Sequence, residues 1–204
     1  MSYQLSAVVA DVELLREQTG ELDHAVLAAL RQDFALLPVT PQLVEELTGT
    51  PPDFAAGDPS PEQPFGVVLP ASFTGTLAGW SRLGPVAYLE AEFHGGLGHQ
   101  ASVVWLGGAV GFGPVFDAAL DGPREQWPIN AALHRLGVER GRWIDPFAEV
   151  GLHLERNTAG WLAHGRRGLS ADYWDELAEE WEEQESGADQ QPERPRHVGD
   201  WGLP

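Results

Sequence analysis

Four side chains that can act together chemically lie within one short segment of the chain. Glu90, Glu92 and His94 alternate along the run AYLEAEFH, and His99 follows the glycine-rich residues 95–98. Alternate residues of a β-strand share one face, and a tight turn at 95–98 returns the chain toward that face. The pattern therefore predicts two carboxylates and two imidazoles side by side on one surface.

Three roles fit such a surface, and the sequence leaves them open. The first is a contact surface for a basic partner, and the second is a plain solvent-facing strand. The third is a divalent-metal site, because imidazole and carboxylate are ligands for zinc and related ions, although no HExxH spacing is present. We assign a partner-binding role, no catalytic role, and leave metal binding open, for the set Glu90, Glu92, His94, His99 and Gln100.

Three other patterns approach catalytic or cofactor motifs but fail on local grounds. Residues 96–101 fit the dinucleotide fingerprint G-x-G-x-x-A, but the strand-forming run SVVWL follows where a helix N-terminus must face the pyrophosphate. Ser81 lacks the glycine two residues later that a nucleophile elbow needs. Glu90 and Glu92, roughly 6–7 Å apart on a strand, have acid–base chemistry, but no pocket can be inferred for them. No cofactor is expected.

The charge of the chain points to the class of partner. The 204 residues carry a formal net charge of −19, with no cysteine and no lysine. Residues 169–204 hold eleven acids and two arginines, and residues 1–168 hold twenty acids and ten arginines. An acidic surface disfavours nucleic acid, whose phosphates need cations, and attracts basic proteins. No signal peptide or membrane span is evident, so a cytoplasmic location is expected.

Local patterns predict the elements that position these residues. Strands are expected from alternation and β-forming residues, and helices from caps such as Thr40-Pro41 and Asp145-Pro146. Residues 50–64 contain five prolines and are expected to form a mobile loop. The expected strands span residues 3–9, 34–39, 86–94, 99–106 and 109–116, and the expected helices span residues 11–18, 40–48, 72–81, 129–136, 158–164 and a short segment after 145.

The expected fold class is α+β, with a mostly antiparallel sheet, helices packed on one face, an acidic C-terminal helix and a disordered tail. One domain is expected over residues 1–186 and the tail over residues 187–204. The C-terminal helix starts after Ser170 and carries an aromatic stripe that includes Trp174. The tryptophans expected in the core are Trp80, Trp105, Trp161 and Trp174.

The run YLEAEFHGGLGHQASVVW resembles a strand–GGxGxQ–strand hairpin of small acidic bacterial proteins, some of which are similar to immunity proteins of polymorphic toxin systems. The runs INAALHRLGV and DPFAEVGLHLERNTAGW belong to the same pattern, so the resemblance covers roughly residues 85–161. It implies a protein that binds and blocks a toxin domain without catalysis. The chain departs from the pattern at His99, where a small residue is expected, and no catalytic residue carries over.

These observations together predict a non-catalytic, cytoplasmic binding protein, an immunity- or antitoxin-like inhibitor of a basic, toxin-like protein. The alternative is a metal-dependent enzyme that uses Glu90, Glu92, His94 and His99. An enzyme should gather these side chains in a concave pocket, whereas a binder should present them on an open surface. The sequence carries no signal of oligomeric state.

Overall fold

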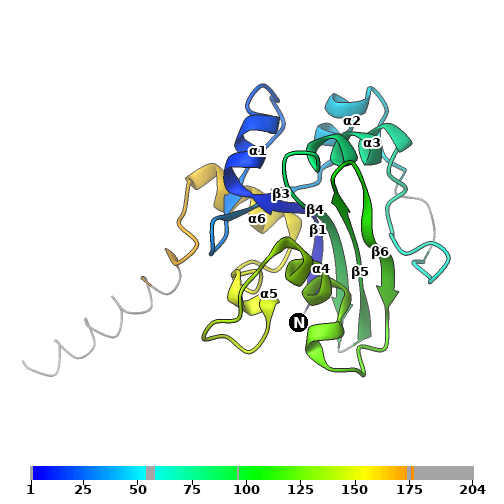
Figure 1. The fold of residues 1–204 in the computed structure, drawn as a ribbon, viewed down its shortest axis with the longest axis vertical. Coiled ribbons are helices and arrows are strands. Elements are labelled where there is room, and N and C mark those ends of the chain that lie inside the picture. Colours follow the sequence, from blue (N-terminus) through cyan, green and yellow to red (C-terminus); the bar gives the residue numbers. More distant parts are fainter. Residues whose placement is uncertain (1, 54–57, 96, 174–175, 177–204) are drawn as a thin grey trace, which may run out of the picture. The chain divides into compact units, whose positions relative to one another are not determined.

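The structure, a computed structural model, describes residues 2–53, 58–95, 97–173 and 176 (Figure 1). The chain divides into two units, residues 1–171 and residues 172–204. In the second unit, the Glu176 amide donates to the Asp172 carbonyl at 2.9 Å. Trp174, most of the expected C-terminal helix and the whole expected tail lie outside the described residues.

One six-stranded sheet organises the first unit, in the order β2-β3-β1-β4-β5-β6. Every pair of neighbouring strands is antiparallel, which confirms the α+β class and the antiparallel sheet. The N-terminal strand joins this sheet beside the hairpin, and the FALLPV strand pairs with the other edge of the N-terminal strand. The strands are β1 (Ser2–Asp11), β2 (Ala28–Ala29), β3 (Phe34–Pro38), β4 (Val86–His94), β5 (Leu97–Leu106) and β6 (Ala109–Asp117).

Three helices begin at the capping residues Asp11, Thr40 and Asp145 that the sequence marks. The Thr40 hydroxyl accepts the Leu43 amide at 3.1 Å, and the helix that follows ends at Gly49 in the left-handed conformation, with a φ of 69°. The carboxylates of Asp11 and Asp145 accept amides of the next helices in the same way. The helices are α1 (Val12–Thr19), α2 (Pro41–Thr48), α3 (Ala71–Trp80), the 3₁₀ turn η1 (Arg124–Gln126), α4 (Pro128–Leu136), α5 (Pro146–Glu149) and α6 (Thr158–Arg167).

Helices cover both faces of the sheet, so the expectation of one covered face is wrong. On one face, Leu5 and Leu89 pack with residues of α4 and with Trp161 of α6; Figure 1 shows α4 in front of the sheet. On the other face, Val8 and Tyr88 pack with residues of α1, α2 and α3. Both faces are apolar at the end of the sheet where β4 begins and β5 ends, so both must be buried. Trp80, Trp105 and Trp161 are in the core as expected.

The hairpin of β4 and β5 pairs in continuous antiparallel register from Val86 opposite Trp105 to His94 opposite Leu97. A strand, and not a helix, therefore follows the glycines of residues 96–101, and the dinucleotide fingerprint has no structural counterpart here. No helix in the described part of the chain has the length and apolar character needed to span a bilayer.

Candidate functional site

The structure brings together four of the five candidate residues on one face of the hairpin. Glu90, Glu92 and His94 alternate along β4, and Glu92 lies directly opposite His99 of β5. This face is the one covered by α1, α2 and α3 at its other end. The strand pattern therefore places the side chains as expected, but their surroundings differ sharply from one residue to the next.

Glu90 is buried, with 4% of its surface exposed, and it joins the strand to a preceding loop. Its Oε2 accepts the Gly66 amide at 2.8 Å, and the carboxylate also accepts the amide of Val67. Its Oε1 accepts the hydroxyl of Tyr88, two residues earlier on the same face. The expected open strand face is therefore wrong at this position, because residues 66–67 lie over it.

Burial raises the pKa of Glu90 above its usual 4.5, and the nearby Glu92 carboxylate adds to the increase. The hydrogen bonds from Tyr88, Gly66 and Val67 favour the charged form and oppose this effect. Burial and the adjacent Glu90 carboxylate also raise the pKa of Tyr88 well above 10. Tyr88 is thus a neutral hydrogen-bond donor at physiological pH, and Glu90 is its acceptor.

Glu92 is the accessible carboxylate of the hairpin and stands between two imidazoles. Its side chain is 48% exposed, and its Oε1 lies 3.5 Å from Nε2 of His94, which is 70% exposed. His99, on the facing strand, packs against Phe116 with ring centroids 5.4 Å apart. Burial lowers the pKa of His99 below 6.5, and the Glu92 carboxylate opposes that shift. His99 is therefore a neutral imidazole near pH 7.

A hollow of about 340 Å³ lies between this face and the segment that contains residues 58–67. Of the described residues, three carboxylates line it and no arginine does. A cationic group that enters it therefore meets acids on more than one side. The lining residues are Gln4, Leu5, Ser6, Asp58, Pro59, Gly66, Val67, Glu90, Ala91, Glu92 and His99.

An apolar groove of about 440 Å³ adjoins the hollow at Val67. Phe65 and Leu69 of the loop form one side, and Val103 and Trp105 of β5 form the other. The ring of Phe65 stands edge-on to that of Tyr88, with centroids 5.1 Å apart. Tyr88 thus connects the two spaces, since it lines the groove and its hydroxyl donates to Glu90, which lines the hollow.

The arrangement does not form a metal centre among the residues that the structure describes. Nowhere in residues 2–53, 58–95, 97–173 and 176 do three histidine, aspartate or glutamate side chains lie close enough together to hold an ion. His94 does not line the hollow. The carboxylate of Glu90 already accepts hydrogen bonds from a loop amide and from the Tyr88 hydroxyl. The concave shape expected of an enzyme site is thus present without the expected ligand set.

Gln100, the fifth candidate, lies on the opposite face of the sheet. It pairs with Ala91 across the hairpin and lines a separate pocket with Tyr3 and Phe93. One residue after His99, it must point to the other face. Gln100 therefore does not belong to the acidic site.

Sequence reasoning missed the residues that come to the hollow from elsewhere in the chain. Ser6 of β1 and Asp58 are distant in sequence, and no local pattern marks them. The position of Tyr88 beside Glu90 was predictable, because residues two apart on a strand share one face.

Comparison with known proteins adds no family to this description. No protein-family model matches the chain, and neither curated proteins nor solved structures give a match.

Proposed function

We propose that this protein is a non-catalytic binding protein of the immunity-protein kind, which inhibits a basic protein by taking one of its arginine side chains into the acidic hollow. One observation carries the proposal: among the residues that the structure describes, three carboxylates and no arginine line a concave site on a strongly acidic chain. Glu92 and Asp58 are the carboxylates available to a ligand, whereas Glu90 is held by the loop amides and Tyr88. A cation is the ligand that this lining favours.

Arginine fits the hollow better than lysine does. Its planar guanidinium donates to two carboxylates at once and is weakly hydrated, so it loses less on leaving water than an ammonium group. Charge-assisted hydrogen bonds of this kind contribute about 1.5–3 kcal/mol each. No arginine is among the described residues that line the hollow with Glu92 and Asp58, so an arginine from a partner meets no competing guanidinium from them.

In the same proposal, the adjoining apolar groove binds the residue next to the partner's arginine. Aromatic side chains are enriched among the residues that anchor protein interfaces, and Phe65, Val103 and Trp105 offer a surface for one. The net charge of −19 speeds the encounter with a basic partner by steering. A cytoplasmic location and the absence of nucleic acid among the partners belong to this proposal.

The test compares a short arginine peptide with an uncharged analogue of the same peptide. Acetyl-Leu-Arg-Leu-amide is titrated into the protein while backbone amide shifts are followed by NMR, alongside the peptide in which citrulline replaces arginine. We expect millimolar binding of the arginine peptide, largest shifts at Gly66 and Glu92, and loss of binding on adding salt. The citrulline peptide should bind at least about tenfold weaker, because it lacks the charge.

Two variants of equal charge localise the effect. Glu92→Gln with Asp58→Asn should abolish the shifts, whereas Glu21→Gln with Asp23→Asn, at exposed positions beside α1, should leave them nearly unchanged. Equal binding of the citrulline and arginine peptides would overturn the proposal. The same conclusion would follow if both double variants weakened binding equally, because the effect would then be net charge alone.

A further inference from the structure

A second pocket, of about 250 Å³, lies on the opposite face of the sheet, at the end of the hairpin. Aromatic rings of Tyr3, Phe93, Trp127 and Phe147 form most of its walls. Phe93 can lie there because its cross-strand neighbour is Gly98. A Cβ at that position would be 2.4 Å from Cδ1 of Phe93 and 2.2 Å from the Glu92 carbonyl oxygen. The glycine of the GGxGxQ hairpin therefore makes room for one wall of the pocket.

The glutamine of the same hairpin provides a free donor inside the pocket. Gln100 is more than nine-tenths buried, and its Oε1 accepts the Ile129 amide at 3.2 Å. That bond orients the amide group, so Nε2 is the atom left to face the pocket. Nε2 donates to no residue in the part of the chain that the structure describes. A ligand with an acceptor in the pocket would take a hydrogen bond from this N–H group.

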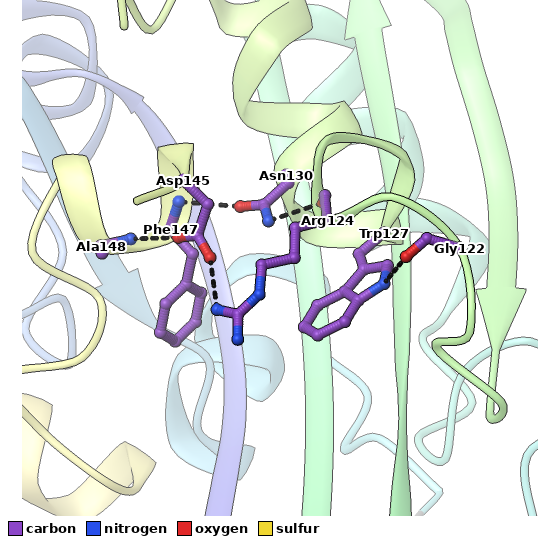
Figure 2. Close-up of polar contacts among 7 residues, drawn as sticks. All are labelled: Gly122, Arg124, Trp127, Asn130, Asp145, Phe147 and Ala148. Carbon is purple, nitrogen blue, oxygen red and sulfur yellow. Dashed lines mark hydrogen bonds and ion pairs between the residues drawn. The ribbon is translucent and has the colours of Figure 1, made fainter. Parts of the chain in front are cut away.

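Arg124 stands at the same pocket and is held in place by Trp127 and Asp145. Figure 2 shows its guanidinium between the rings of Trp127 and Phe147; the Trp127 centroid is 5.3 Å away. Its Nη1 donates to Oδ2 of the buried Asp145 at 3.2 Å. The Arg124 side chain is 51% exposed, and the guanidinium has five N–H groups. The others are available to an incoming anion.

The acceptors of this pocket, in contrast, are already in use. Oδ1 of Asn130 accepts the Phe147 amide and its Nδ2 donates to the Arg124 carbonyl, both at 2.8 Å (Figure 2). Oδ1 of Asp145 accepts the Ala148 amide at 2.9 Å. The groups without partners are thus donors, and the ligand must supply acceptors.

The segment that supplies most residues of this pocket has a positive formal net charge, whereas the segment before it has a negative one. Residues 1–123 hold fifteen acids and three arginines, whereas residues 124–168 hold seven arginines and five acids. Arg124, Trp127, Asn130, Asp145 and Phe147 all come from the second segment. An organic anion is therefore repelled less here than at the acidic hollow.

From these observations we infer a second binding site, for a small carboxylate with a single aromatic ring. The ring packs among Tyr3, Phe93 and Phe147, and the carboxylate accepts from Arg124 and from Nε2 of Gln100. The volume suits one ring and not a drug-sized molecule. Bidentate pairing of arginine with a carboxylate sets the orientation. The site is on the other face from the acidic hollow and does not depend on the function proposed above.

The test uses phenylacetate, with phenylacetamide and acetate as comparison ligands. The indole N–H of Trp127, which donates to the Gly122 carbonyl at 3.1 Å, is the NMR reporter, and the Gly66 amide reports on the acidic hollow. We expect phenylacetate to shift the Trp127 signal in a saturable way and to leave the Gly66 signal in place. Phenylacetamide lacks the charge and acetate lacks the ring, so each should bind at least about tenfold weaker.

Three variants of the pocket complete the test. Gln100→Glu keeps the acceptor for the Ile129 amide but replaces the free donor with an anion, and Arg124→Gln removes the cation; each should weaken binding at least about tenfold. Arg124→Lys keeps the charge without the planar fork and should bind with intermediate affinity. Arg135→Gln, whose arginine lies over Phe112 outside the pocket, should bind like the parent protein. A thermal melt of each variant identifies any that fail to fold.

Two outcomes would overturn the inference. One is binding of phenylacetate that Arg124→Gln and Gln100→Glu leave intact in folded protein. The other is a Trp127 shift of equal size with acetate, which would show that no ring is recognised. Failure here with success of the arginine peptide would leave the acidic hollow as the sole binding site of the two.

Discussion

The hydroxyl of Tyr88 donates to Oε1 of Glu90, two residues along the same strand, and both side chains are buried. The amides of Gly66 and Val67 complete the set of donors around this carboxylate. Three neutral donors therefore balance this buried acid, and no arginine is among the hydrogen-bond partners that the described residues supply. The bond connects the acidic hollow to the apolar groove, because Tyr88 lines the groove and Glu90 lines the hollow.

Truncation of Glu90 should cost far more stability than its conversion to an amide. Glu90→Ala leaves the Tyr88 hydroxyl and two loop amides without an acceptor, and we expect a loss of about 3 kcal/mol in the free energy of unfolding. Glu90→Gln keeps an oxygen for the loop amides and should cost about 1 kcal/mol. Urea denaturation of both variants measures the difference. Equal losses would show that the loop amides do not depend on this carboxylate.

Glu90 and Glu46 should affect the pH dependence of stability with opposite signs. The folded-state pKa of Glu90 is raised, so the folded protein binds this proton more tightly and its contribution to stability falls as pH rises above 4.5. The pKa of Glu46 is lowered by hydrogen bonds from the His24 and Asp23 amides, so its contribution is lost as pH falls below 4.5.

Unfolding free energies of the parent protein, Glu90→Gln and Glu46→Gln between pH 3 and pH 7 test these signs. The advantage of the parent protein over Glu90→Gln should shrink with rising pH, and its advantage over Glu46→Gln should grow. Parallel curves for the two variants would contradict the environment assigned to Glu90.

Acidification below pH 6.5 should destabilise the fold through His164. Its side chain is buried, 5.3 Å from the Trp161 ring, and Nδ1 lies 3.9 Å from Oε1 of Glu155. Burial lowers the pKa of His164 below 6.5, with Glu155 in opposition. The unfolded chain then binds the proton more readily, so stability is present above pH 6.5 and is lost as pH falls through the lowered folded-state pKa.

His164→Gln should reduce the slope of stability against pH in that range, as measured by thermal melting at pH 5, 6 and 7. His134→Gln makes the same change at an exposed position of α4 and should leave the slope as it is. An identical slope in His164→Gln and the parent protein would show that His164 is not the group whose titration changes the stability.

Alanine at Gly98 should destabilise the hairpin. The added Cβ would lie 2.2 Å from the Glu92 carbonyl oxygen and 2.4 Å from Cδ1 of Phe93, so the strand or the ring must move. We expect a loss of about 1–3 kcal/mol. The control is Gly75→Ala, at an exposed position inside α3 with no atom within 4 Å of the new Cβ, which should stabilise by up to about 1 kcal/mol. Denaturant midpoints compare the two, and a neutral Gly98→Ala would contradict the close approach.

The elements of the fold were predictable because their signals are local. A capping hydroxyl with proline after it marks the start of α2, and Gly49 marks its end, since only neighbouring backbone groups decide a cap. Alternation along β4 placed Glu90, Glu92 and His94 on one face for the same reason. The apolar residues Val8, Val86 and Val103 also indicate that the second face of the sheet is buried. A strand pattern does not say which element covers that face.

Residue types and strand spacing by themselves put Glu90 and Glu92 on one face. Gln100 was expected in the same site, and the pairing of β4 with β5, which sets it opposite Ala91, places it on the other face. Only the tertiary structure decided that Glu90 is buried while Glu92, two residues later on the same face, is half exposed. The cause is the Gly66 amide, which reaches Glu90 across 24 residues of sequence. Burial depends on which distant segment lies over a side chain, and a local pattern of polar and apolar residues does not contain that information.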